Sequence, residues 1–566
     1  MDFRWRIKEK ADVNTVELLS QEINVNPTLA NMLANRGVTN FQKAKDFFRP
    51  DLDKLHDPFL MQDMDKAVER LISAISKGEK ILVYGDYDVD GTTSVALFYG
   101  FLKEFYDNIG FYIPDRYKEG YGISDKGVMY AAENGFSLVV SLDCGIKAID
   151  KIDLANTLGV DFIICDHHTP GDELPQAIAI LDPKRIDCLY PYKELSGCGV
   201  GFKLIQAFSI KTQRDPINLY AYLDLLAVSI ASDIVPITGE NRILAFYGLD
   251  RVNNNPRPGL KALILKGKLK KDIDITDIVF KIGPRINASG RIEHAKASVE
   301  LLISKDLETA VRRAELVEDV NAARKNFDEN ITKEALQMIE LRESEGIFRS
   351  TVLFKEDWHK GVIGIVASRC IERYYRPTII LTESNNKATG SARSVFDFDI
   401  YEAIQECSEL LDQFGGHKYA AGLTMSVANV PAFQAKFEQV VSKRIHETHL
   451  KPTLEIDDEL LLDQINYKFY NILKQMAPFG PGNPEPIFCV NQVYAENVKI
   501  LKEKHLRFEI IQDGQQTRPI CIGFGFGEYF DFLNSKMRFN MAFELRENTF
   551  RNTSSLQLYV KDIKFD

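Results

Sequence analysis

The feature that most constrains the fold of this chain is a short apolar segment followed by three closely spaced carboxylates. Residues 81–84 read Ile-Leu-Val-Tyr, which is typical of a short buried strand. Asp86, Asp88 and Asp90 follow at alternate positions, and alternate side chains of a nearly extended chain point the same way. Because converging carboxylates repel one another, the pattern favours a bound cation. Taken alone, it also fits a solvated acidic loop between a core strand and a helix over residues 92–105.

Three further apolar segments also end in an acid or an imidazole. Residues 137–142 precede Asp143, residues 161–165 precede Asp166, His167 and His168, and residues 227–232 precede Asp233. In open parallel sheets, ligands bind outside the carboxyl ends of the strands. Carboxylates combined with imidazole suit Mn²⁺ or Mg²⁺, with Zn²⁺ as an alternative. The four segments together predict a metal site at one edge of a parallel sheet.

Length and composition limit the kinds of protein that this chain can be. The chain of 566 residues is long enough for about three or four domains. Its formal net charge of −11 excludes a uniformly basic coat, so any nucleic-acid path must be a local cationic groove. No apolar run approaches the ~20 residues that span a bilayer, and the N-terminus lacks the apolar region of a signal peptide. The eight cysteines form no Cys-x-x-Cys pair, which fits free thiols in a cytoplasmic protein.

The order of the predicted elements indicates an α/β multidomain chain. Between residue 80 and about residue 250, short apolar runs alternate with helical stretches, which is typical of a parallel sheet. The expected strands are 80–84, 110–114, 137–142, 161–165 and 177–181. A glycine-rich stretch, 197–203, predicts a tight turn before a helix over 201–210. A nucleotide-binding loop is the less favoured interpretation, because no strand precedes the stretch.

The second half of the chain predicts a long helix, a second α/β unit and a barrel. Residues 291–345 contain no Gly or Pro and have helical apolar spacing, which predicts one long helix or two abutting helices. Residues 351–354 and 378–381 are expected strands on either side of a helix over 362–373. His446 and His449 are one residue short of the zincin spacing, so we interpret them as solvated side chains.

Residues beyond about 454 return to the alternation typical of strands. The segments that show it begin at residues 499, 506, 518, 537 and 555. They predict a small barrel, for which a purely structural β-domain is the alternative. Residues 1–75 read as mainly helical, with a capped helix over 26–37 and no evident chemistry.

Four motifs carry a family resemblance. The sequences Asp-Tyr-Asp-Val-Asp-Gly, Leu-Asp-Cys-Gly, Asp-His-His and Ala-Ser-Asp, in this order, resemble the four motifs of the DHH phosphoesterase superfamily. Further motifs resemble the RecJ family of single-strand-specific 5′→3′ exonucleases, and the matches run from about residue 85 to the C-terminus. These motifs are Pro114–Gly122, Gly283–Arg291, His359–Gly364, Gly390–Ser394, Gly415–Gly422 and Ala477–Pro484.

The resemblance implies a division of the chain into five parts. The parts are an N-terminal helical segment (1–75), a DHH catalytic domain (76–250), a connecting helical region (251–345), a DHH-associated α/β domain (346–452) and an OB-fold nucleic-acid-binding barrel (453–566). An OB-fold binds single strands through base stacking and backbone contacts.

The resemblance also implies a site with two metal ions, Mn²⁺ or Mg²⁺. Asp88 would bind the first ion and Asp90 the second, and Asp143 would bridge them. His167 and Asp233 would complete the second site. Two ions can activate a water molecule and clamp a phosphate, which accounts for hydrolysis without a protein nucleophile.

Three neighbouring residues would support the ions. Asp86 either binds an ion directly or acts on a residue that does, and spacing does not decide between the two. Asp166 would orient an imidazole, and His168 would face the scissile phosphate.

Five further residues match the positions at which the family contacts its substrate. Arg285 would contact phosphate beside the ions. Arg116, Ser391 and Arg393 would hold the terminal 5′-phosphate, and His417 would contact a nucleotide. The planar guanidinium of arginine suits this role because it donates paired hydrogen bonds to oxyanions.

The implied function is that of a metal-dependent 5′→3′ exodeoxyribonuclease. It would release 5′-mononucleotides from single-stranded DNA in repair and recombination, as a monomer away from membranes, with single-strand-binding protein and a helicase as partners. One alternative is a DHH enzyme acting on short oligonucleotides or cyclic dinucleotides, although those relatives are generally shorter and lack the barrel. The other is a non-catalytic DNA-binding scaffold, but here every ligand position is filled.

Overall fold

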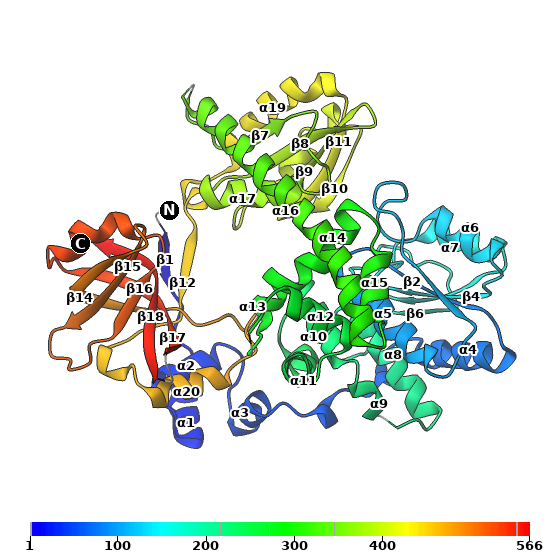
Figure 1. Ribbon diagram of the computed structural model, residues 1–566, viewed down its shortest axis with the longest axis horizontal. Coiled ribbons are helices and arrows are strands. Elements are labelled where there is room, and N and C mark those ends of the chain that lie inside the picture. Colours follow the sequence, from blue (N-terminus) through cyan, green and yellow to red (C-terminus); the bar gives the residue numbers. More distant parts are fainter. Residues whose placement is uncertain (1–2, 216, 271, 345, 551–552, 566) are drawn as a thin grey trace. The chain divides into compact units, whose positions relative to one another are not determined.

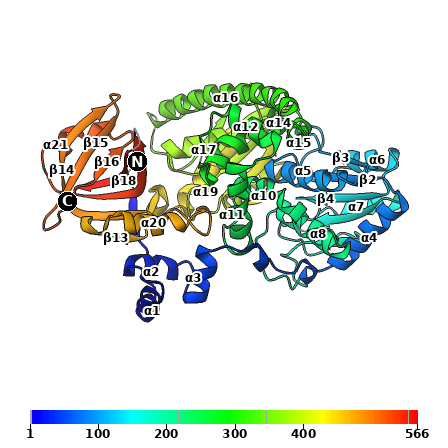
Figure 2. The same ribbon diagram turned by 60° about the horizontal axis from the view of Figure 1, so that its bottom comes forward.

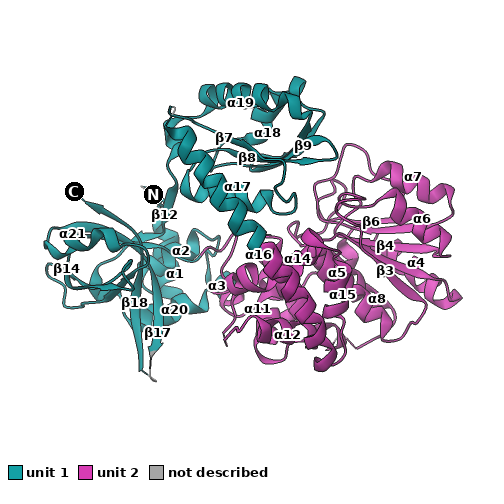
Figure 3. Ribbon diagram, turned by 45° about the horizontal axis from the view of Figure 1, so that its top comes forward, with its two compact units in different colours: residues 1–44, 325–476, 485–566 teal, residues 45–324, 477–484 magenta. Residues whose placement is uncertain are grey.

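The computed structural model describes residues 3–215, 217–270, 272–344, 346–550 and 553–565. It divides into two compact units, coloured separately in Figure 3. Unit 1 comprises residues 1–44, 325–476 and 485–566, and unit 2 comprises residues 45–324 and 477–484.

A five-stranded parallel sheet forms the centre of unit 2. Its strand order is β3-β2-β4-β5-β6, and every neighbouring pair is parallel. The strands are β2 (Ile81–Gly85), β3 (Ile109–Tyr112), β4 (Leu138–Leu142), β5 (Asp161–Cys165) and β6 (Ala179–Leu181). These bounds confirm the five strands expected from the sequence. Because the strands are parallel, all five carboxyl ends lie at one edge of the sheet.

Alternate residues of each strand are buried against helices on opposite faces of this sheet. Val83 and Val140 pack in one apolar cluster with α4, α5 and α8, whereas Leu82 and Val139 pack in another with α6 and α7. These helices are α4 (Met64–Lys77), α5 (Val89–Lys103), α6 (Asp125–Glu133), α7 (Ile149–Thr157) and α8 (Gly197–Lys211). Burial on both faces explains why the strands read as continuous apolar runs.

Two sequence predictions need correction in this unit. The apolar segment 227–232 belongs to helix α10 (Leu223–Ser232), so Asp233 lies at a helix C-terminus. A fully buried helix has no polar face, and short apolar runs do not distinguish it from a strand. The glycine-rich stretch is the start of α8, with Ser196 as its N-cap, and is not a turn before the helix.

The remaining helices of unit 2 follow the sheet. They are α9 (Ile217–Tyr220), α11 (Gly239–Asn254), α12 (Pro258–Lys266), α13 (Ile275–Asp277), α14 (Gly283–Ile292) and α15 (Lys296–Leu302). The stretch 291–345 contains the end of α14, the short α15 and the 37-residue helix α16 (Leu307–Glu343), which is continuous in Figure 2. The predicted long helix is therefore present, although it begins later than expected.

Unit 1 contains a second, mixed sheet. Its order is β10-β11-β9-β8-β7, in which only the pair β7 and β8 is parallel. The strands are β7 (Thr351–Phe354), β8 (Thr378–Ser384), β9 (Lys387–Arg393), β10 (Gln413–His417) and β11 (Ala420–Met425). The helices are α17 (Ile363–Arg373), α18 (Ile400–Gln405) and α19 (Val430–Arg444). The expected strands and helix of the second α/β unit are confirmed.

The last part of unit 1 is a closed barrel. Its strands follow the order β14-β15-β16-β18-β17, and pairing of β17 with β14 closes it (Figure 1). They are β14 (Phe488–Leu501), β15 (His505–Gln512), β16 (Ile520–Gly523), β17 (Phe539–Phe550) and β18 (Thr553–Phe565). Helices α20 (Tyr467–Gln475) and α21 (Phe530–Asn534) accompany them, and β13 (Asp458–Glu459) pairs with β14. This architecture confirms the predicted barrel.

The N-terminal segment is helical except at its start. Helices α1 (Val13–Ile23), α2 (Pro27–Ala34) and α3 (Phe41–Phe48) follow a strand, β1 (Arg4–Ile7), that the sequence analysis missed. Strand β1 lies beside β12 (Thr453–Ile456) in parallel register, so this strand has a partner about 450 residues away. Among the described residues, no helix is long and apolar enough to cross a membrane.

Candidate metal centre

The carboxyl ends of three neighbouring strands bring acidic side chains to one edge of the unit 2 sheet. Asp86 follows β2, Asp143 follows β4, and Asp166 follows β5. All three are buried. The backbone of Asp143 has φ 60°, a left-handed conformation that Asp tolerates better than most residues. Its N–H donates to Cys165 O at 2.9 Å, which fixes the turn after β4.

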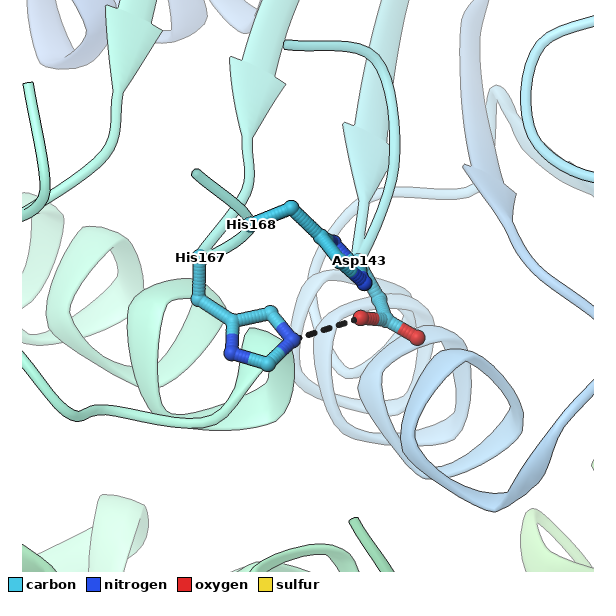
Figure 4. A group of neighbouring side chains, drawn as sticks. All are labelled: Asp143, His167 and His168. Carbon is cyan, nitrogen blue, oxygen red and sulfur yellow. Dashed lines mark ion pairs between the residues drawn. The ribbon is translucent and has the colours of Figure 1, made fainter. Parts of the chain in front are cut away.

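His167 lies at the centre of the cluster. Its Nε2 is 3.2 Å from Asp143 Oδ1, 3.5 Å from Asp233 Oδ2 and 3.7 Å from Asp90 Oδ2. Figure 4 shows its ring pointing toward the Asp143 carboxylate, with His168 beside it. Two sets of side chains have donor atoms close enough to share a cation: Asp90, His167 and Asp233, and Asp143, His167 and His168. His167 belongs to both sets.

The N-terminus of α8 holds Asp90 in place. Its carboxylate accepts hydrogen bonds from Gly197 N at 2.7 Å, from Cys198 N at 2.9 Å and from the Ser229 hydroxyl at 2.6 Å. A helix N-terminus stabilises an anion through its free N–H groups and its dipole. These contacts fix the orientation of the Asp90 side chain, which is only 1% exposed.

Asp86 and Asp88 are fixed by backbone donors near β2. Asp88 is the N-cap of α5 and accepts from Gly91 N at 3.0 Å. Asp86 accepts from Gly122 N at 3.2 Å, and Gly122 belongs to a loop that starts after β3. Burial and the neighbouring carboxylate charges raise the pKa of both acids.

Several buried atoms of the cluster have no hydrogen-bond partner in the described part of the chain. They are Oδ2 of Asp86, Asp143 and Asp233, together with both ring nitrogens of His167. Burial, followed by repulsion from Asp90, raises the pKa of Asp143 well above its ordinary value and that of Asp233 to about 9. Leaving buried polar atoms unpaired is costly, and one or more divalent cations would satisfy them and remove the repulsion. The donor set of carboxylates and imidazole fits Mn²⁺ or Mg²⁺.

A second imidazole is oriented by Asp166. Its Oδ1 is 2.7 Å from His168 Nδ1, and Oδ2 accepts from Ile146 N at 2.9 Å. Burial opposes both charges, but the pairing outweighs it, so the pKa of Asp166 falls to about 2 and that of His168 rises to about 9. His168 is therefore a cation at neutral pH, with Nε2 3.1 Å from the hydroxyl of Tyr121.

Sequence reasoning missed three residues that shape this site. Tyr121 contacts His168, Ser229 binds Asp90, and Gly197 donates to Asp90. Tyr121 lies in a motif that was noted, so its position offered a signal. Gly197 and Ser229 also lie in stretches with a sequence pattern, but nothing in that pattern indicates contact with Asp90, which is more than 100 residues away.

Comparison with known proteins decides the family. The DHH family N-terminal domain matches residues 80–230, the DHHA1 domain matches residues 346–443, and the RecJ OB domain matches residues 456–562. The single-stranded-DNA-specific exonuclease RecJ of Bacillus subtilis (strain 168) is 36% identical over 99% of this chain and 70% of its own length. Its counterpart from Salmonella typhimurium (strain LT2) is 32% identical over 95% of this chain and 96% of its own. The chain belongs to the RecJ family.

Solved RecJ structures agree with this assignment. The crystal structure of RecJ from Thermus thermophilus in complex with Mn²⁺ has a TM-score of 0.85 at 26% identity, covering 100% of this chain and 80% of that one. The complex with Mg²⁺ has a TM-score of 0.79 at 25% identity, covering 100% and 79%. The cations in these RecJ structures are those expected here from the donor set.

The residues that resemble RecJ substrate contacts lie in both units. In unit 2, Arg116 stacks over the Tyr87 ring at 5.0 Å, and Arg285 pairs with Glu318 of α16. In unit 1, Arg393 Nη1 is 3.0 Å from Ser391 Oγ on β9, and His417 ends β10 with an exposed side chain. Their roles as RecJ-type substrate contacts remain predictions.

Gly197→Ala is expected to displace the Asp143 carboxylate and reduce turnover in this RecJ family member. A Cβ at this position would lie 2.6 Å from Asp143 Cβ and 2.8 Å from its Cα. These distances are too short for non-bonded carbon atoms, so Asp143 or helix α8 must move. Overpacking of this kind costs about 1–3 kcal/mol. The matched control is Gly199→Ala in the same helix, where the nearest atom is Leu195 Cδ2 at 3.3 Å. Turnover and urea unfolding of both variants check the prediction, which fails if the two behave alike.

Proposed function

We propose that this chain is a metal-dependent exonuclease that hydrolyses single-stranded DNA from its 5′ end and releases 5′-mononucleotides. One observation carries the proposal: carboxylates and imidazoles gather at the sheet edge of a DHH domain, where several of their buried atoms have no hydrogen-bond partner among the described residues. The cluster lies in a chain whose relatives are named single-stranded-DNA-specific exonuclease RecJ. Its role would be DNA repair and recombination.

The residues of the cluster would differ in how they bind the metal ions. Asp88 would hold the first of two divalent ions, and Asp90, His167 and Asp233 the second. Asp143 would bridge them, and Asp86 would ligate or orient a ligand. Carboxylate oxygens of Asp90 and Asp233 both lie within 4 Å of His167 Nε2, which supports the grouping of these three residues around the second ion. When bound, the ions would lower the pKa of a water molecule and neutralise the phosphate.

The other residues act on the substrate through charge and hydrogen bonds. His168 keeps its proton at neutral pH because Asp166 raises its pKa to about 9, so it would donate a hydrogen bond to a phosphate oxygen. Arg285 would add a cation beside the phosphate, and Arg116 would do the same for the terminal group. A charge-assisted hydrogen bond of this kind is about twice as strong as a neutral one.

The OB barrel favours this proposal over a small-substrate DHH enzyme. A phosphodiesterase for short oligonucleotides or cyclic dinucleotides has no need of a single-strand-binding barrel, whereas residues 456–562 match the RecJ OB domain. A non-catalytic scaffold is disfavoured because every predicted ligand position is filled in the sequence.

The decisive experiment uses DNA strands labelled at one end. The purified chain with Mn²⁺ should shorten a 5′-labelled single strand from the labelled end, leave a duplex of the same sequence intact, and lose activity when the metal is chelated. Release of label from the 3′ end first, or equal attack on the duplex, contradicts the proposal. Selective cleavage of cyclic dinucleotides would support the small-substrate alternative.

We propose that the enzyme acts as a monomer in the cytoplasm, with single-strand-binding protein and a helicase as partners. The five-part division of the chain given above is likewise a proposal.

Arg393→Ala should weaken the use of strands that carry a 5′-phosphate. Ser391 and Arg393 lie on β9 with their side chains 3.0 Å apart, an arrangement that suits a phosphate. Loss of a hydrogen bond to a charged group costs about 1.5–3 kcal/mol, so kcat/KM on 5′-phosphorylated strands should fall about tenfold or more. On 5′-hydroxyl strands it should change little. Lys387→Ala, on the same strand, is the charge-matched control; equal losses on both substrates would make Arg393 a general backbone contact.

Phe524→Ala should weaken the binding of long single strands. Phe524 is 59% exposed on the barrel, with the His505 ring 5.4 Å away and the Tyr559 ring 5.6 Å away. A base stacked on such a ring contributes about 1–3 kcal/mol, so the Kd should rise about fivefold or more. Fluorescence anisotropy with a metal-free sample measures it. Met537→Ala, at a barrel residue that is 56% exposed, is the control; an equal effect there would exclude stacking on Phe524.

A further inference from the structure

A cavity of about 180 Å³ in unit 1 is lined by eight residues, three of which, Arg4, Arg6 and Lys451, carry cationic side chains. Three segments that are distant in sequence surround it: strand β1, the chain leading into β12, and the loop after β9. The ionisable residues that line it are Arg4, Arg6, Asp397, His449 and Lys451. None of them belongs to the metal centre or to the predicted contacts for the terminal phosphate.

The charges around this cavity are not balanced. Arg6 pairs with Glu455, and the carboxylate of Asp397 is 2.8 Å from Lys418 Nζ. The charges of Arg6 and Asp397 are therefore largely offset by these partners. Arg4 donates to the hydroxyl of Thr453 at 3.0 Å and makes no ion pair with any residue that the structure describes. Its guanidinium therefore keeps donors and a full positive charge for an outside anion.

The paired histidines do not turn the cavity into a metal site. The rings of His446 and His449 are 5.4 Å apart, and His449 Nδ1 accepts a hydrogen bond from His446 N. Within the described ranges, no third His, Cys, Asp or Glu joins them in a cluster of metal-ligand geometry. The chemistry of the lining is that of an anion site.

The cavity is joined firmly to the OB barrel. Strand β1 pairs with β12 from Arg4 to Ile7, and Trp5 Nε1 donates to Asp562 of β18 at 2.7 Å. Lys8 Nζ is 3.0 Å from Asp457, directly after β12. Because these contacts connect Arg4 to the barrel, a strand bound to the barrel could continue to the cavity without a flexible joint. Phe396, which is 52% exposed, lines the same cavity and offers a ring to a neighbouring base.

We propose that this cavity binds a backbone phosphate of single-stranded DNA and extends the grip of the barrel along the strand. The inference rests on the proposed function of the chain. A nucleic-acid phosphate fits better than an acidic peptide, because the cavity combines an unpaired guanidinium with an exposed aromatic ring, which together suit a nucleotide. Arg4 would donate to the phosphate, Lys451 would add a second positive charge, and Phe396 would stack on the base.

The test compares two double variants of the full chain. Arg4→Gln/Lys451→Gln removes two charges at the cavity, and Lys443→Gln/Lys474→Gln removes two charges from exposed positions elsewhere in unit 1. Binding of an oligothymidylate of about thirty nucleotides is measured without divalent metal over a range of salt concentrations. The cavity variant should bind about fivefold more weakly, and the slope of log Kd against log salt should fall by about 0.7 per lost phosphate contact. The control variant should change neither by as much.

Short substrates separate this inference from the proposed function. Hydrolysis of an oligothymidylate of about four nucleotides with Mn²⁺ should be the same in the wild type and the cavity variant, which also shows that the variant folds. Equal weakening in both double variants, or an unchanged salt slope, overturns the inference. Loss of affinity for a polyglutamate peptide with unchanged DNA binding also overturns it, in favour of a protein-docking site. If the wild type neither binds nor degrades single strands, the proposed function itself fails.

Discussion

Asp143→Asn is expected to reduce turnover by about a thousandfold, the scale of losing one essential charge-stabilising group. The Asp143 carboxylate is 3.2 Å from His167 Nε2, and its other oxygen has no partner in the described part of the protein. Asparagine preserves the shape of the side chain and tolerates the left-handed backbone at φ 60°. It removes the charge that would bridge two ions. Steady-state hydrolysis of a single strand over a range of Mn²⁺ concentrations measures the loss.

The same substitution should stabilise the metal-free protein. Burial, followed by repulsion from Asp90 and other carboxylates, raises the pKa of Asp143, so a neutral amide avoids both the cost of burying a carboxylate and the repulsion within the cluster. The Tm without metal should therefore rise, while the gain in Tm on adding Mn²⁺ should shrink. Asp153→Asn, on the exposed face of α7, is the control and should change neither. Recovery of turnover at high Mn²⁺ would rule out a bridging role for Asp143.

Lys203→Met is expected to lower the free energy of unfolding by about 3–5 kcal/mol, the cost of breaking a buried ion pair from one side. Lys203 is fully buried in α8; its Nζ donates to His56 O at 2.6 Å and lies 3.2 Å from Glu240 Oε1. The other carboxylate oxygen of Glu240 accepts from the Tyr190 hydroxyl at 2.6 Å. Without Lys203, the buried side chain of Glu240 loses the one cation that pairs with it among the residues that the structure describes. Urea unfolding, followed by tyrosine fluorescence, measures the loss.

A second substitution separates charge from packing. Lys203→Met/Glu240→Gln removes both charges and should recover most of the stability, because the remaining amide can still accept from Tyr190. Lys211→Met, at the exposed end of the same helix, should be nearly neutral. If the double variant is as unstable as Lys203→Met, the main contribution of Lys203 is its packing and its bond to His56.

Much of the candidate site could be predicted from local sequence. Each of the acids Asp86, Asp143 and Asp166 follows an apolar strand, and the rule that parallel strands align their carboxyl ends places them together without further information. The predicted strands agree with β2 to β6, because a strand buried on both faces has a strong and short apolar signature. The alternation after residue 454 predicted the barrel, and the motifs that resemble RecJ added its assignment as an OB-fold and the order of the domains.

Contacts between distant segments could not be predicted in this way. Asp233 comes from the end of helix α10, whose uniform burial hides its helical period. Gly197 binds Asp90 across 107 positions, and β1 pairs with β12 across a separation of 449 positions. Neither contact has a local sequence pattern.

The sequence by itself therefore predicted the candidate ligands and determined which sheet edge presents the acids that follow β2, β4 and β5, because strand period and parallel pairing are local or general rules. Only the tertiary structure decided how the cluster is held. The N-terminus of α8 orients Asp90, Asp166 keeps His168 charged, and Tyr121 contacts that imidazole. The contacts of Asp90 and Tyr121 join segments far apart in the chain, whereas Asp166 and His168 are two residues apart in the turn after β5. The energy of each contact depends on burial, which arises only when the fold excludes water.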